Sequence, residues 1–181
     1  MAFTAFRTWV ASEVITAALL NAQVRDNGLI LKTSIADDGT LAGLLFGRVT
    51  SDVSATSTTT LADVTGLSFP IGVSEEWTFV CFVHIEGNTS ADARFGVTVP
   101  SGAAGRYGLP IASGAGVEDA TIGTDIFQSL VTGADILAII AGTVVNSTTG
   151  GTVQLQMAQG SSNGDPTVVY ANSSIIAVKI A

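Results

Sequence analysis

The sequence predicts a mostly β protein: an antiparallel β-sandwich of the jelly-roll type, preceded by a short N-terminal α-helix. Three observations lead to this prediction. From Leu44 onward, short runs alternate apolar and polar residues with a period of two. Turns rich in Ser, Thr, Asn and Gly, such as NSTTGG and SSNGDP, separate these runs, as is typical of sandwiches. A helical pattern, in contrast, is found in one segment, WVASEVITAALLNAQVRDNGLILK.

The helical pattern lies between Ser12 and Leu31. Thr16 suits the N-cap position, because its hydroxyl oxygen can accept a hydrogen bond from an amide of the first turn. An isolated helix shorter than about 12–15 residues is marginal in water, so this one needs a packing partner. The residues that follow the 3-4-3-4 spacing of a coiled-coil seam are Ala17, Leu20, Val24, Asn27 and Leu31.

A chain of 181 residues is long enough for one principal domain with an appendage. We expect an N-terminal anchor with the helix at residues 1–33, a turn-rich linker at 34–43 and the β-domain at 44–181. The longest apolar run, residues 136–145, is too short to span a bilayer, so no membrane insertion is expected. Glu13 interrupts the apolar core that a signal peptide would need, which predicts synthesis in the cytosol.

The strand expected at residues 78–86 carries apolar residues on both faces. Phe79 and Cys81 lie on one face, and Val80 and Phe82 lie on the other. This pattern predicts a strand that is covered on both sides. The glycine-containing stretch IASGAGVEDATIG is expected to form a long flexible loop. The other expected strands are residues 44–50, 58–64, 67–71, 93–99, 105–110, 127–131, 137–145, 151–160, 167–170 and 174–180.

Charge and residue counts exclude several classes of function. The net charge is −8 with only seven Lys and Arg, so no basic stripe is present to bind nucleic acid. Cys81 and His84 are the sole residues of their types and lie among apolar neighbours, which excludes the common zinc sets. Cys81 is expected to be a buried small hydrophobe, and His84 a neutral side chain satisfied within the sheet. We therefore expect no catalytic residues, no cofactor and no metal.

A carbohydrate-active enzyme is the alternative that the residue counts leave open, because glycosidases need only two suitably placed carboxylates. Every candidate acid lies beside turn residues, where solvated carboxylates are common. The candidates are Glu75, Glu76, Glu86, Glu118, Asp119 and Asp125.

Two stretches resemble virion structural proteins of tailed bacteriophages. The N-terminal stretch contains Trp9, the block EVITA at 13–17, Leu20-Asn21 and the block VRDN at 24–27, in the order found in that family. Ser12 stands where the family usually has Gly. The second stretch, VVNSTTGGTVQLQMAQGSSNGDPTVVYANSSIIAVKI at 144–180, resembles the closing strands of small head-fibre, decoration and tail-fibre domains. Together the two stretches cover about a third of the chain.

The resemblance implies a homotrimer in which a slender anchoring helix joins a jelly roll similar to tumour-necrosis-factor-like domains. The seam then has a partner, because three copies of Leu20, Val24 and Leu31 would face one another while Asn27 sets the register. The alternative is that Leu20 and Val24 pack the helix against its own β-domain. The residues expected to bind the virion partner as anchors are Phe3, Phe6, Trp9 and Val14.

The function expected from the resemblance is that of a virion structural protein, a capsid decoration or head-fibre protein that docks on a phage capsid or tail protein. The alternative is a small tail-fibre or receptor-binding tip, in which loops within residues 102–123 contact the host surface, including its carbohydrate. Either function places the protein in the virion and requires no chemistry.

Overall fold

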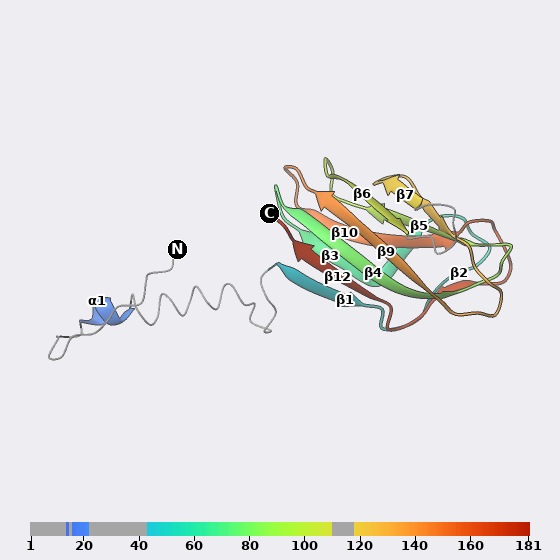
Figure 1. Ribbon diagram of the computed structural model, residues 1–181, viewed down its shortest axis with the longest axis horizontal. Helices are drawn as coiled ribbons and strands as arrows, with labels where there is room; N and C mark the ends of the chain where they lie inside the picture. Colours follow the sequence, from blue (N-terminus) through green and yellow to red (C-terminus); the bar gives the residue numbers. More distant parts are fainter. Residues whose placement is uncertain (1–13, 15, 22–42, 110–117) are drawn as a thin grey trace. The chain divides into compact units, whose positions relative to one another are not determined.

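The computed structural model describes residues 14, 16–21, 43–109 and 118–181 (Figure 1). The chain divides into two compact units, Met1–Leu44 and Leu45–Ala181. In the first unit the described residues contain one short helix, α1 (Ala17–Leu20). The remainder of the helix expected between Ser12 and Leu31 lies outside the described residues.

Two antiparallel sheets form the second unit, which confirms the expectation of a mostly β protein. In the described residues one sheet has eight strands and the other has four. The strands of the eight-stranded sheet are β1 (Leu44–Arg48), β2 (Val53–Ala55), β4 (Glu76–Glu86), β6 (Ala104–Leu109), β7 (Glu118–Thr121), β9 (Ile136–Val145), β11 (Thr167–Val169) and β12 (Ser174–Lys179). Those of the four-stranded sheet are β3 (Ala62–Ile71), β5 (Ala93–Thr98), β8 (Ile126–Gln128) and β10 (Gly151–Gln159).

The strand order brings distant parts of the chain together. The larger sheet runs β1–β12–β4–β9–β6–β7, and β11 and β2 continue it beside the end of β4. The smaller sheet runs β3–β10–β5–β8. From β3 to β6 and from β7 to β11, every successive strand lies in the opposite sheet, so the two sheets are linked by many crossings.

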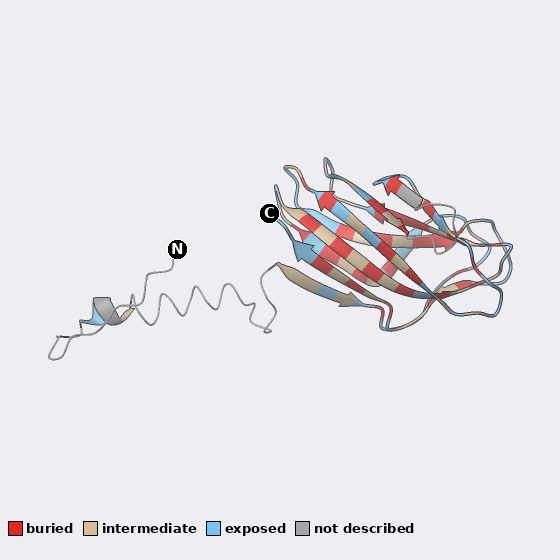
Figure 2. Ribbon diagram, in the orientation of Figure 1, coloured by how far each residue is buried: buried red, intermediate tan, exposed pale blue. Residues whose placement is uncertain are grey.

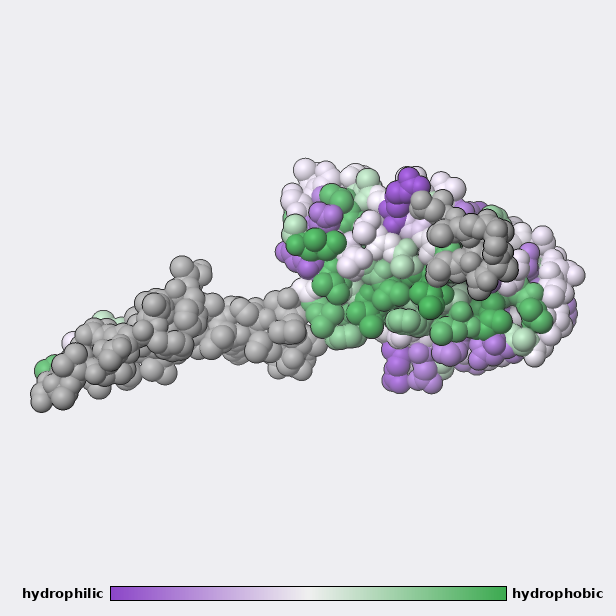
Figure 3. Space-filling view, viewed as in Figure 1, coloured by the Kyte–Doolittle hydropathy of each residue, from purple (hydrophilic) through white to green (hydrophobic). Residues whose placement is uncertain are grey.

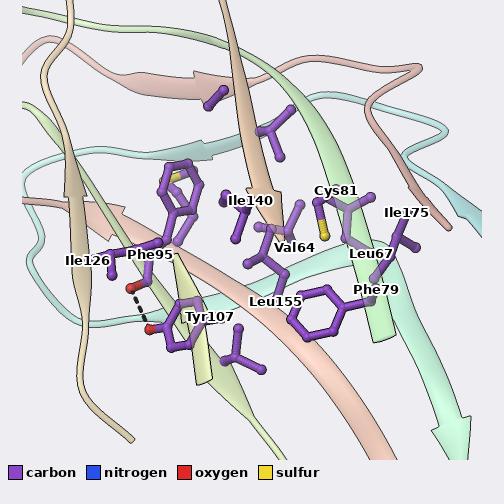
Figure 4. Packing of buried hydrophobic residues seen from close by; sticks show 14 of the residues in the cluster. Val64, Leu67, Phe79, Cys81, Phe95, Tyr107, Ile126, Ile140, Leu155 and Ile175 are labelled. Atoms are coloured by element: carbon purple, nitrogen blue, oxygen red, sulfur yellow. Dashed lines mark hydrogen bonds between the residues drawn. The ribbon is translucent and has the colours of Figure 1, made fainter. Parts of the chain in front are cut away.

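The core lies between the two sheets and follows from the period-two alternation (Figure 2). Along β4, the odd-numbered residues from Trp77 to Ile85 are buried, and the even-numbered ones are partly or fully exposed. Leu155 of β10 and Ile140 of β9 meet in this core (Figure 4). Tyr107 is also buried, and its hydroxyl donates hydrogen bonds to the carbonyl oxygens of Thr124 and Phe95.

One expected pair of strands is a single strand in the structure. Residues 58–64 and 67–71 were expected separately, but β3 runs continuously from Ala62 to Ile71, and residues 58–61 lie outside it. Its register with β10 shifts at a bulge between Gln154 and Gln156. Gly66 permits the bulge because its φ is +96° and an added Cβ would lie 2.2 Å from the Arg48 carbonyl oxygen. The Gln154 side-chain amide donates to the carbonyl oxygens of Val64 and Leu67, which lie in the part of β3 that the bulge takes out of register.

Two strands were not expected. The first, β2, is only three residues long and too short to show alternation. The second, β7 (Glu118–Thr121), lies in the stretch expected to be a long flexible loop. It pairs with β6, with Tyr107 opposite Ala120, so this part of the loop prediction is wrong. Buried Ala120 explains the pairing, because its small side chain adds to the core.

Candidate functional site

The predicted anchor and seam residues fall mostly outside the described residues. Val14 is 81% exposed, and Ala17 is exposed within α1. Leu20 ends α1. An exposed apolar side chain such as Val14 is available for a partner, but the anchor and the seam stay predictions. Those outside the described residues are Phe3, Phe6, Trp9, Val24, Asn27 and Leu31.

The outer surface of the eight-stranded sheet is apolar, and it is the largest feature of the β-domain that sequence analysis did not assign to a site. Its strands lie towards the viewer in Figure 1, and a hydrophobic band crosses the same region in Figure 3. We call this surface the apolar face. It consists of Phe46 on β1, Val80 and Phe82 on β4, Leu137, Ile139, Ala141 and Val145 on β9, and Ile176 and Val178 on β12. One polar row, Thr78 and Thr143, crosses it between Ala141 and Val145.

Strand register brings these side chains together. Val80 lies opposite Ile176 on one side and opposite Ala141 on the other. Phe82 lies opposite Ile139 in the same way. Directly opposed residues of an antiparallel pair have Cβ atoms about 4.5–5.5 Å apart, so the rows form a continuous surface.

The outward residues of the four-stranded sheet are different. On β10, exposed Thr152 and half-buried Gln154 and Gln156 point away from the core. On β5, Arg94 points outward, and its guanidinium binds the Asp125 carboxylate. The apolar face is therefore a property of one sheet and not a result of the overall composition.

Charged groups surround the apolar face but do not enter its centre. His84, at the Leu137 end, has Nδ1 3.7 Å from Oδ2 of Asp135. At the opposite end Glu76 pairs with Val145, and Arg106 of β6 pairs with Thr143. On β4, β9 and β12, the outward positions between Glu76 and His84 carry no charged side chain, and Arg106 borders them from β6.

Each candidate carboxylate whose contacts are described has a partner. Glu75 accepts hydrogen bonds from the Gly72 amide at 2.6 Å, from Trp77 Nε1 at 2.9 Å and from Lys179 Nζ at 2.9 Å. Lys179, then Trp77 and then Gly72 lower the pKa of Glu75 to about 2. A carboxylate held ionised in this way serves as a structural clamp.

Glu86 lies at the other end of β4 and accepts a hydrogen bond from the Tyr170 hydroxyl. This bond is the main cause that raises the pKa of Tyr170. Nearby, Asp52 accepts a hydrogen bond from the amide of Ala171. These contacts fasten the β11–β12 turn to the end of β4 and to the β1–β2 connection, which is also a structural role.

Cys81 is fully buried in the core, and desolvation raises the pKa of its thiol far above the ordinary value. His84 is 47% exposed at its side chain, so the expectation that it lies satisfied inside the sheet is corrected to a position at the edge of the apolar face. Within the described residues, no three His, Cys, Asp or Glu side chains are grouped to hold a metal ion. The same residues contain no helix with the length and apolarity needed to cross a bilayer.

The apolar face had a signal in the sequence. The alternation of β4 places apolar residues on both faces, which predicts a strand covered on both sides. In the described residues the opposite sheet covers only the odd-numbered side, while Val80 and Phe82 stay partly exposed. The sequence pattern predicted that the even-numbered face of β4 would also be covered, but it did not indicate which segment or partner would cover it.

Two solved structures illustrate what the chain is similar to. The chain is similar to the tripod from the baseplate of bacteriophage Tuc2009, with a TM-score of 0.37 and 10% identity over 98% of this chain and 76% of that chain. It is also similar to a chain of infectious bursal disease virus, Gx strain, with a TM-score of 0.24 and 11% identity over 75% of this chain. That comparison spans 40% of the viral chain. No protein-family model and no curated protein matches the sequence.

Proposed function

We propose that the protein is a bacteriophage virion structural protein, a homotrimeric capsid decoration or head-fibre protein that acts by binding and not by catalysis. The observation that carries the proposal is the resemblance of residues 9–27 to the N-terminal segment of phage virion proteins. The β-domain supports it, because Glu75, Glu86 and Asp125 make contacts that hold the fold together and one face of its larger sheet is mostly apolar.

The strand order supports the finer assignment of the sandwich as a jelly roll. Strands β1, β12, β4 and β9 form one set of four neighbours, and β3, β10, β5 and β8 form the other. Successive strands that alternate between two such sets are typical of a double-sheet jelly roll. The β6–β7 hairpin extends one of the sheets at its edge.

The proposed mechanism is stabilisation by binding. The N-terminal anchor, with Trp9 and the two Phe residues before it, would place large apolar side chains in a pocket of a capsid or tail protein. A protein that binds the assembled particle better than its separate parts shifts the equilibrium towards the particle. Exposed Val14 fits this role, because it offers an apolar side chain within the anchor.

Deleting residues 1–31 tests the anchor. We expect the shortened protein to fold, because the core lies within residues 49–177, and to lose its binding to particles. Cosedimentation with purified particles that lack the protein measures the binding, and circular dichroism checks the fold. The matched control is the full chain with Ala62→Glu, an exposed change in the β-domain that should leave particle binding intact. Undiminished binding by the shortened protein would overturn the proposed anchor.

The second candidate is a tail-fibre or receptor-binding tip that contacts the host surface. The observation that favours it is the β6–β7 hairpin at the edge of the larger sheet, since its connection falls within the residues expected to form a host-contacting loop. Imaging of virions labelled with an antibody to this chain distinguishes the candidates. Label on the head supports decoration, label at the tail tip supports receptor binding, and absence of label contradicts both.

A further inference from the structure

We infer that the apolar face of the eight-stranded sheet is the surface through which copies of this chain pack against one another. The inference rests on the proposed homotrimer, and it assigns the contact to the β-domain in addition to the N-terminal seam. It follows from three properties of the face: its residue pattern, its lack of central charge and its extent.

The residue pattern of the apolar face indicates that another molecule covers it. Ile176, Val80 and Ala141 form one row across three adjacent strands, and Phe82 and Ile139 continue it in the next row. Outward positions of an antiparallel sheet that faces water are ordinarily polar, as Gln154 and Gln156 are on the other sheet. An apolar outward surface on one sheet alone therefore indicates a partner on that side.

The charges favour a second copy as that partner. The chain has a net charge of −8, so two copies repel each other wherever acidic surfaces meet. The rows of Val80 and Phe82 carry no charged side chain among the described residues; His84 and Glu76 lie at the ends of the face, and Arg106 lies at its β6 border. Identical copies can therefore meet there without opposing like charges. A basic partner, in contrast, would be expected to meet acidic residues in the contact surface.

The extent of the face suits an interface between subunits. Four neighbouring strands about 4.8 Å apart, of which β1 and β12 are shorter than β9, cover roughly 500 Å² of sheet, with Thr78 and Thr143 included. This is more than half of the approximately 800 Å² that each partner contributes to a stable interface. Exposed Phe46 and Val178 widen the apolar area towards β1 and β12.

The test places a charge at the centre of the face in the full chain. Ala141 is exposed and lies between Val80 and Gly108, so Ala141→Glu should not disturb the isolated fold. Burying the new carboxylate between copies should raise the concentration needed for association about a hundredfold. Ala62→Glu is the matched control, because Ala62 is an exposed strand residue of the other sheet.

Sedimentation velocity at micromolar concentration is the measurement, with circular dichroism as the check on folding. An oligomeric wild type and Ala62→Glu protein together with a monomeric Ala141→Glu protein would support the interface. If Ala141→Glu proves misfolded, Val178→Asp serves as the second variant and Val131→Asp as its control, since Val131 lies in the loop after β8.

Two results would overturn the inference. A monomeric wild-type chain would mean that the N-terminal segment or another protein covers the face. An Ala141→Glu chain as oligomeric as the wild type would mean that copies associate elsewhere. Failure of the proposed function gives a different pattern. Oligomers that bind no particle would overturn the virion role but not the interface. Monomers that bind particles would overturn the interface but not the virion role.

Discussion

The Glu75 clamp should make part of the stability of the β-domain depend on pH. Its carboxylate connects the Gly72 amide, the Trp77 indole and the Lys179 ammonium, and so joins the β3–β4 turn to both β4 and β12. The perturbation is Glu75→Gln. This change keeps the size of the side chain and removes the charge.

The magnitude follows from the lowered pKa of Glu75. A fall from 4.5 to about 2 corresponds to about 3 kcal/mol at roughly 1.4 kcal/mol per pH unit. The side chains of Glu75 and Lys179 are 25% and 39% exposed, so solvent screening reduces the expected loss to about 1–2 kcal/mol. For a domain of this size, that loss lowers the melting temperature by roughly 3–6 °C.

The sign is set by the direction of the pKa change. Because the folded protein holds the carboxylate ionised, the stabilisation is present above the unfolded pKa of 4.5 and is lost as the pH falls towards 2. Calorimetry of wild type and Glu75→Gln at pH 7, 4 and 2, at one protein concentration, measures it. We expect the difference between them to disappear at pH 2. A difference of equal size at pH 7 and pH 2 would refute the reasoning.

Two further predictions concern buried groups. Cys81 should not react with a thiol reagent in the native protein, because burial excludes the reagent and raises the pKa of the thiol. Rapid labelling of the native protein would contradict the position of Cys81 in the core. Tyr107→Phe should lower the free energy of unfolding by about 1–3 kcal/mol in urea titration, because it removes the hydrogen bond that the buried hydroxyl donates to the Thr124 carbonyl oxygen, with that of Phe95 as second acceptor. Tyr170→Phe, at a partly exposed position, is the control and should cost less.

Alternation was enough to predict the long strands. The inward residues are apolar along the whole of β4 and from Val153 to Met157 in β10, so the pattern identified both strands and their buried faces. It could not predict that residues 62–64 and 67–71, expected in two separate strands, belong to one strand, because Gly66 interrupts the period. The bulge depends on Gln154 of a strand far away in sequence, which local patterns do not contain.

The candidate site was predicted less well, for a physical reason. The apolar residues of β4, β9 and β12 meet only because the fold places β4 between the other two strands. Each strand alone has the pattern of a strand that is covered on both faces. The sequence does not show that, in the described residues of one chain, protein covers only the inward face. The two-faced pattern of β4 was the available signal.

The place of β12 in the larger sheet affects how the chain must fold. It lies between β1 and β4, and the Arg48 guanidinium reaches Asn172, which lies 124 residues later in the chain. During synthesis, strand β1 therefore remains unpaired until its neighbour β12 has left the ribosome. Such long-range pairing slows folding and leaves an unpaired edge exposed to other nascent chains, so rapid synthesis at high concentration should favour aggregation over correct folding.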